Sequence, residues 1–137
     1  MIKRLAHINI VSKDLSASEH FYCEVLGMKR VFDFLENGSL FGFYLDAGNM
    51  TFIEIFKQRK EVNTASPLIP HICFEVDDID SVIENIRSKG WTITDKRQGG
   101  DKAWQAWMSD PDGLPIEVMQ YTPESSQFTG NPCIVTW

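Results

Sequence analysis

IPHICFEVDDID (residues 69–80) decides the fold, because within a few residues it passes from a strand pattern to the start of a helix. An earlier segment, LAHINIVSKDL (residues 5–15), follows the same plan. Each segment has a histidine near the start of its strand pattern, His71 in one and His7 in the other. The repeat predicts that the chain contains two copies of one small module.

Each half of the chain closes on a strand pattern that carries a glutamate. The closing segments are DAGNMTFIEIF (residues 46–56) and DPDGLPIEVMQ (residues 110–120). Their glutamates, Glu54 and Glu117, follow the histidine of the same half by 47 residues (54 − 7) and by 46 residues (117 − 71). Four side chains that can bind a metal ion therefore occupy matching places in the two halves.

Strand periodicity predicts where these four side chains point. Successive side chains of a strand lie on opposite faces of the sheet. In all four strand patterns the candidate residue lies opposite an apolar row that is suited to packing on a helix. The rows are Ile8 and Ile10, Ile53 and Ile55, Ile72, Phe74 and Val76, and Ile116 and Val118. We therefore expect the four candidate side chains to point into one shared concavity.

The composition fits one compact domain and a small-molecule ligand. The chain has 137 residues, of which 43% are hydrophobic and 12% aromatic. A chain of this size buries roughly two thirds of its unfolded surface, so it can form a core without disulfides. The net charge of −6 argues against nucleic acid and against an anionic membrane surface as partners.

Cysteine usage and hydropathy predict a cytoplasmic enzyme or binding protein. The sequence shows neither an export signal nor an apolar run long enough to span a membrane. Cys23, Cys73 and Cys133 form no CxxC motif and cannot all pair with one another. This pattern fits reduced thiols better than a disulfide framework.

The coarse pattern of elements predicts a βαβββ unit used twice, in an α+β architecture. A helix over 15–26 can begin after Asp14 or Ser12, and a second helix begins after Asp78 and ends before Lys89-Gly90. The strands are expected at 5–11, 31–35, 40–46, 50–56, 69–76, 91–97, 103–109 and 114–121.

This pattern also predicts the organisation of the chain. Module one covers about 1–56, a linker covers 57–70, module two covers about 71–122, and a C-terminal tail covers 123–137. The linker is long enough to separate two modules of a single domain.

Three motifs resemble those of a known superfamily. KDLSASEHFYCEVLGM (residues 13–28), IPHICFEVDDID (residues 69–80) and MSDPDGLPIEVMQ (residues 108–120) are similar to segments of the vicinal-oxygen-chelate superfamily. That superfamily includes glyoxalase I, extradiol dioxygenases and bleomycin resistance proteins. The resemblance, which covers residues 5 to about 121, implies two βαβββ modules that form an incomplete mixed β-barrel around a divalent metal ion.

The resemblance also implies roles for the four repeated side chains. His7, Glu54, His71 and Glu117 match the metal-ligand positions of the superfamily. A set of two histidines and two glutamates is the glyoxalase I pattern, whereas the dioxygenases resemble a three-ligand set that lacks the equivalent of Glu54. Glu117 matches the catalytic base of glyoxalase I, with Glu54 as the second candidate for that role.

The chemistry of these residues supports a metal site independently. Imidazole and carboxylate groups together suit Zn²⁺, Ni²⁺, Co²⁺, Fe²⁺ or Mn²⁺. Two unpaired carboxylates in a cavity would cost several kcal/mol each in desolvation, so a metal ion between them is the simpler account. Such an ion acts as a Lewis acid while a carboxylate moves a proton next to a carbonyl group. Together with the resemblance to glyoxalase I, this chemistry implies a small hemithioacetal or another α-hydroxycarbonyl compound as the substrate.

The resemblance implies glutathione as the thiol co-substrate. Two residues that differ from bacterial glyoxalase I argue against glutathione. Val11 stands where bacterial glyoxalase I has an arginine that anchors a glutathione carboxylate, and Gln58 stands in place of an asparagine. Valine cannot make a bidentate clamp on a carboxylate.

Three aromatic residues are expected to form a wall of the substrate site, with ordinary packing as the alternative for each. These residues are Trp104, Trp107 and Tyr121.

Three functions from different classes remain open. The first is a metal-dependent lyase or isomerase related to lactoylglutathione lyase. The second is an Fe²⁺-dependent ring-cleaving dioxygenase, and the fourth ligand Glu54 counts against it. The third is a protein of the bleomycin-resistance type that sequesters a small molecule without catalysis. The resemblance to glyoxalase I further implies a homodimer with sites at its interface, although two half-barrels can also close within one chain.

Overall fold

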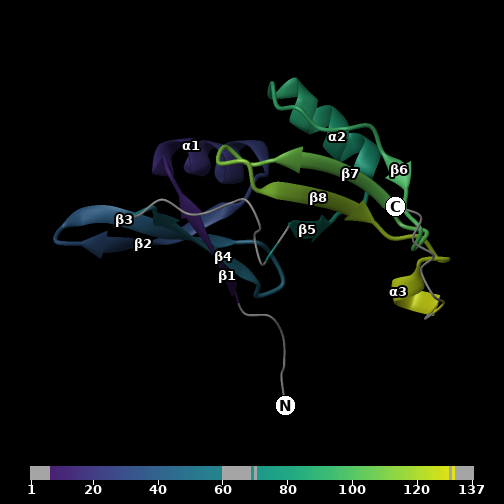
Figure 1. Ribbon diagram of the computed structural model, residues 1–137, viewed down its shortest axis with the longest axis horizontal. Helices are drawn as coiled ribbons and strands as arrows, with labels where there is room; N and C mark the ends of the chain where they lie inside the picture. The colour runs from purple at the N-terminus through teal and green to yellow at the C-terminus, as the bar shows by residue number, and fades with distance from the viewer. Residues whose placement is uncertain (1–6, 60–68, 70, 130, 132–137) are drawn as a thin grey trace, which may run out of the picture. The chain divides into compact units, whose positions relative to one another are not determined.

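The computed structural model describes residues 7–59, 69, 71–129 and 131. The chain forms two compact units, the N-terminal unit (Met1–Ala65) and the C-terminal unit (Ser66–Trp137). Each contains a four-stranded mixed sheet with helices (Figure 1), which confirms the predicted α+β class. The start of the first predicted strand lies outside the described residues. Most of the predicted linker and the end of the tail, with Cys133, also lie outside them. The division of a single domain into modules stays a prediction.

The N-terminal unit follows the predicted βαβββ order. Its elements are β1 (His7–Ser12), α1 (Leu15–Glu19), η1 (His20–Val25), β2 (Lys29–Glu36), β3 (Ser39–Asp46) and β4 (Phe52–Lys57). The strands lie in the order β1-β4-β3-β2, with β1 parallel to β4 and the other pairs antiparallel. The first and last strands of the unit are therefore neighbours.

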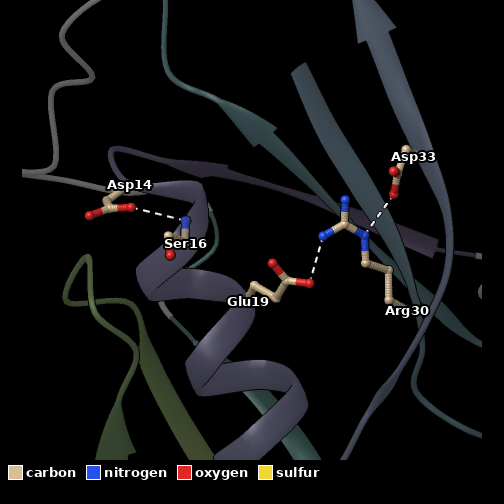
Figure 2. A network of polar contacts seen from close by, with 5 residues as sticks. All are labelled: Asp14, Ser16, Glu19, Arg30 and Asp33. Carbon is tan, nitrogen blue, oxygen red and sulfur yellow. Dashed lines mark hydrogen bonds and ion pairs between the residues drawn. The ribbon is translucent and has the colours of Figure 1, made fainter. Parts of the chain in front are cut away.

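The helix of this unit begins at the predicted cap. Asp14 Oδ1 accepts hydrogen bonds from the backbone N–H groups of Ser16, at 2.9 Å (Figure 2), and of Ala17, at 3.2 Å. These bonds satisfy two of the N–H groups that a helix start leaves without partners. Ser12, the other predicted cap, instead shares a buried hydrogen bond of 2.7 Å with Ser18. Of the two predicted caps, Asp14 thus fulfils that role.

The second half of the helix, η1, is a π-helix. The N–H of Leu26 donates to the carbonyl oxygen of Phe21, five residues back, at 3.0 Å. Gly27 follows with a φ of +74°, which ends the helix where the sequence predicts. One face of the helix is buried despite its wide turn. The buried face of the sheet is the one opposite Glu54. The buried residues are Phe21, Tyr22 and Val25 of the helix and Phe43, Leu45, Ile53 and Ile55 of the sheet.

The C-terminal unit repeats the plan. Its elements are β5 (Ile72–Glu75), α2 (Ile79–Ser88), β6 (Arg97–Gln98), β7 (Trp104–Ser109), β8 (Pro115–Gln120) and α3 (Ser126–Thr129). The strand order is β5-β8-β7-β6, again with the first and last strands of the repeat parallel and adjacent. Helix α2 lies along β7 and β8 (Figure 1) and buries Ile79, Ile83 and Ile86. In the described part of the chain, no helix is long and apolar enough to cross a membrane.

The strand predicted over 91–97 forms only at its end, as β6. The backbone N–H of Thr94 donates to the carbonyl oxygen of Trp107 at 2.9 Å, but the return bond goes from the N–H of Trp107 to the side-chain Oγ1 of Thr94. A side chain thus takes the place of a backbone acceptor, and the regular ladder begins only at Arg97. The prediction was wrong for most of this segment because threonine hydroxyls compete with backbone groups.

Candidate metal centre

The N-terminal unit brings His7 and Glu54 together. His7 opens β1, and Glu54 lies in the parallel neighbour β4, where it pairs with Asn9. His7 Nε2 lies 3.6 Å from Glu54 Oε2, and Asn9 Nδ2 donates to the same oxygen at 3.4 Å. The amide thus helps to fix the carboxylate that faces the imidazole.

The C-terminal unit brings His71 and Glu117 together in the same way. His71 directly precedes β5, and Glu117 lies in β8, where it pairs with Cys73. His71 Nε2 lies 3.4 Å from Glu117 Oε2. Cys73 therefore occupies the position that Asn9 has in the first repeat, two residues after the histidine.

The two pairs differ in the exposure of their carboxylates. The imidazoles are similarly accessible, with 44% of the His7 side chain and 40% of the His71 side chain exposed. The side chain of Glu54 is 18% exposed and that of Glu117 only 7%. A buried carboxylate is costly unless it has a cation or hydrogen-bond donors as partners.

The separations within the pairs fit two ligands of one divalent ion. Two ligands at roughly 2.1 Å from an ion, at angles of roughly 90° to 110°, lie roughly 3.0 to 3.4 Å apart. The observed nitrogen-to-oxygen separations of 3.6 and 3.4 Å approach this range. Each unit supplies two donors, and no group of three or more His, Cys, Asp or Glu side chains with metal-site geometry occurs among the described residues. The convergence of all four side chains stays a prediction.

Neighbouring titratable groups indicate a negative potential around Glu117. Burial raises the pKa of the Cys73 thiol to about 12, and the charge of Glu117 adds to the rise. Burial also raises the pKa of Tyr121, with a further contribution from the charge of Glu75. Negative charge favours the neutral form of both groups. The same potential would favour a cation bound beside Glu117.

Trp107 is the member of the predicted aromatic wall that contacts the pair. Its ring lies 5.0 Å from the His71 ring in an edge-on arrangement, and the residue pairs directly with Glu117. Its indole N–H is buried, and no acceptor among the described residues bonds it. Trp104, three residues earlier on the same strand, lies on the opposite face and carries the ammonium group of Lys96 over its ring. The predicted wall is therefore not continuous.

Sequence reasoning missed a cluster of rings in the N-terminal unit. Five aromatic side chains lie on the face of the sheet that carries Glu54, and we call this surface the ring face. Its members are Phe32, Phe34, Tyr44, Phe52 and Phe56. The signal was present, because the alternation that placed Glu54 also places Phe52 and Phe56 on its face. The pairing of β2 with β3, which adds the other rings, could not be derived from one strand.

Comparisons with known proteins agree with this architecture. The family model for the Glyoxalase/Bleomycin resistance protein/Dioxygenase superfamily matches residues 4–118. A Vibrio parahaemolyticus protein named as a probable lactoylglutathione lyase is 30% identical over 138 residues, which cover 93% of this chain and 97% of that protein.

Two further relatives extend the comparison. Lactoylglutathione lyase GLX1 of Arabidopsis thaliana is 27% identical over 134 residues, or 92% of this chain, but the match spans only 47% of the plant protein. The crystal structure of a glyoxalase family protein from Enterococcus faecalis is 25% identical with a TM-score of 0.74, covering 85% of this chain and 97% of that one.

Proposed function

Since the chain belongs to the glyoxalase, bleomycin resistance protein and dioxygenase superfamily, we propose that it is a divalent-metal-dependent lyase or isomerase of the glyoxalase I type. The observation that carries the proposal is the repeated histidine–glutamate pair, with separations of 3.6 and 3.4 Å at equivalent places in two sheets. The proposed ligands of one ion are His7, Glu54, His71 and Glu117. The ion, which is Ni²⁺, Zn²⁺, Co²⁺, Fe²⁺ or Mn²⁺ in this proposal, would supply Lewis-acid stabilisation of negative charge on substrate oxygens.

Glu117 is the proposed catalytic base, and Glu54 is the second candidate. The carboxylate of Glu117 would take the proton from the carbon next to a carbonyl group and return it to the adjacent carbon. The reaction moves a hydrogen within one molecule, so it needs no oxidant or reductant. The position of Glu117 supports this role, because a general base must act from a fixed place, and this carboxylate is buried with its Oε2 3.4 Å from His71 Nε2.

The proposed substrate is a small hemithioacetal or another α-hydroxycarbonyl compound, with a thiol as co-substrate. Glutathione is one thiol to test. Val11, which stands at the position of the glutathione-anchoring arginine, is 42% exposed and offers no hydrogen-bond donor from its side chain. A smaller or less charged thiol therefore fits this position better.

The proposal includes a homodimer in the cytoplasm. The resemblance to glyoxalase I supports the dimer, and the reduced cysteines expected from the sequence support the compartment. Analytical ultracentrifugation of the metal-loaded protein tests the assembly. A monomer that retains its metal would contradict the dimer and leave the chemistry unaffected.

Elemental analysis tests the metal site directly. The parent protein and a Glu54→Ala, Glu117→Ala variant are purified without tags, and each metal is counted per chain. We expect about one ion per parent chain and little in the variant. Absence of metal from the parent, even after incubation with the five candidate ions, would overturn the proposal.

The ring face favours a second candidate function, a non-catalytic binder. Partly exposed rings such as Phe32 and Tyr44 are typical of surfaces that hold small apolar molecules. Binding that does not depend on metal, followed by recovery of unchanged ligand, would support this second function over the first.

A further inference from the structure

The candidate ligand Glu54 lies in one transverse row with two aromatic rings. The strand register pairs Glu54 with Tyr44, and Tyr44 in turn with Phe32. On the other side of Glu54 the row ends at Asn9. A row of directly opposed residues crosses the sheet on one face, so the two rings continue in line from the carboxylate.

Tyr44 is stacked nearly flat on Phe32 of the same row and on Phe52, which lies two residues before Glu54 on β4. Phe32 and Tyr44 have centroids 4.6 Å apart and planes inclined by 20°, and Tyr44 and Phe52 have values of 5.0 Å and 23°. The His7 ring meets the edge of Tyr44 at 5.9 Å. The stack therefore starts at Phe32 and reaches the imidazole of the candidate site.

A glycine makes room for the next row of rings. Gly42 pairs with Phe34 on one side and with Phe56 on the other, and these rings meet at 4.8 Å. A Cβ on Gly42 would lie 2.7 Å from the Phe56 ring and would also overlap the carbonyl oxygen of Ile55. The close approach of the rings thus depends on glycine at this position.

Packing of the core does not account for the ring face. The core lies on the opposite face, where Phe43 and Leu45 are completely buried. On the ring face, Phe32 remains 47% exposed although it is stacked on Tyr44. The other four rings of this face are half-buried. Apolar surface that stays accessible beside a candidate site commonly marks a place where a ligand binds.

The described arginines of the N-terminal unit are already bonded to carboxylates. Arg30 donates to Glu19 and to Asp33 at 2.6 Å each (Figure 2), and its guanidinium lies over Phe43, on the core side of the sheet. Arg59 bonds Glu36 and lies 4.5 Å above the Phe41 ring. Phe41 in turn meets the Phe56 ring at 5.2 Å, so the guanidinium of Arg59, already bonded to Glu36, lies at the Phe56 end of the ring face. The stack of Phe32, Tyr44 and Phe52 offers a substrate a flat apolar surface.

We propose that the ring face selects substrates that carry a planar aromatic group next to the reacting carbonyl. This inference rests on the proposed function and names its substrate class. An aromatic ring would extend the stack of Phe32, Tyr44 and Phe52, while the oxygens of the same molecule face His7 and Glu54. The rings of this stack carry no charge that could pair with the charged arms of glutathione, so an arylglyoxal adduct of a small thiol matches the stack best.

A pair of hydroxamates tests the inference without relying on turnover. Benzohydroxamate and acetohydroxamate share one metal-chelating head and differ in a phenyl ring. Their affinities for the Ni²⁺-loaded full-length protein are measured by titration calorimetry. We expect benzohydroxamate to bind about tenfold more tightly, because offset ring stacking and ring burial add to the common head.

Two variants test whether the preference for benzohydroxamate arises from the ring face. Phe32→Leu should reduce the ratio of the two affinities to about twofold or less and leave acetohydroxamate binding unchanged. Val31→Ala is the matched control, since Val31 adjoins Phe32 on β2, is 53% exposed and contributes no ring. It should leave the ratio as in the parent. Phe32 is partly exposed, so its replacement should not prevent folding.

The outcomes separate the inference from the proposed function. Equal affinities of the two hydroxamates, or an unchanged ratio in Phe32→Leu, would overturn the aromatic substrate class and leave the metal-dependent function in place. Failure of both hydroxamates to bind the metal-loaded protein would overturn the proposed function and the inference with it.

Discussion

In both units a glutamate lies in a row of paired residues that crosses the sheet. The neighbours and the exposure of the glutamate differ between the units. In the N-terminal unit, Glu54 stands between Asn9 and Tyr44, and further rings follow. In the C-terminal unit, Glu117 stands between Cys73 and Trp107. The first glutamate is partly exposed beside apolar rings, whereas the second is buried among acidic groups.

This difference teaches how a repeated module can divide two tasks. The repeated backbone keeps a histidine and a glutamate at the same place in each sheet. The side chains around the two glutamates then differ, since Glu54 is partly exposed beside Tyr44 and Glu117 is buried beside Trp107. Under the proposed function, proton transfer would fall to the C-terminal unit and recognition of the apolar part of the substrate to the N-terminal unit.

Replacement of the two glutamates should give the largest effect and the sharpest test of this division. Glu117→Gln should lower kcat per bound metal by about 10²- to 10⁴-fold, because a positioned base contributes this much. Glu54→Gln should lower kcat per bound metal much less. The rates are measured with the adduct of phenylglyoxal and 2-mercaptoethanol, and bound metal is counted in the same samples. A larger loss in Glu54→Gln would reverse the assignment.

The pH dependence of metal binding tests whether the two histidines act alike. A protonated imidazole cannot bind a metal ion, so affinity should fall as pH falls. With two histidines as ligands, we expect the loss to approach about 100-fold per pH unit where protons compete at both imidazoles. Competition titrations between pH 4.5 and 7.5 measure the slope. A loss of about tenfold per unit would mean that only one histidine binds the metal.

Replacing two glycines by alanine should lower the free energy of unfolding by different amounts, because the atoms around Gly42 can move less than those around Gly99. In Gly42→Ala the new Cβ would meet the backbone oxygen of Ile55, which cannot move alone, so we expect unfolding to become easier by about 3 kcal/mol. In Gly99→Ala it would meet the side chains of Gln105 and Asp101, which can rotate, so we expect a loss of about 1 kcal/mol. Urea unfolding measures both changes. Equal losses of unfolding free energy would show that both sites accommodate the added methyl group equally well.

The helix caps should give the smallest effect and show what the units share. Asp14 and Asp78 cap their helices in the same way, with one carboxylate oxygen that accepts two backbone N–H bonds. Alanine at either position should cost about 1 kcal/mol of unfolding free energy, and asparagine should restore most of it. A clearly larger loss at Asp14 would show that the π-helix that follows α1 depends on its cap.

Local rules were sufficient to predict most of the fold. Strand alternation placed Glu54 and Glu117 opposite their aliphatic rows, and Asp-capped helix starts gave both helix N-termini. The π-helix was not foreseen, because the bond from Leu26 to Phe21 leaves the apolar pattern of an ordinary helix nearly unchanged. The strand predicted over 91–97 is regular only at its end, as β6, because one threonine side chain replaces a backbone partner.

The candidate site could be predicted only as far as its pairs. Contact between His7 and Glu54 follows once the first and last strands of a unit are parallel neighbours. The ring face required the register of β2 on β3, which depends on a tight turn and on two bulges rather than on composition. The meeting of all four ligands depends on contacts that no single strand pattern contains, and it stays a prediction.

The contact between Trp107 and His71 also supplies a built-in optical reporter. All four tryptophans of the chain, Trp91, Trp104, Trp107 and Trp137, belong to the C-terminal unit. Of the three described ones, Trp107 is the one whose ring contacts a candidate metal ligand. An ion with unpaired d electrons, such as Co²⁺, held by His71 would quench its fluorescence. The emission of Trp107 would therefore report when the ion reaches His71.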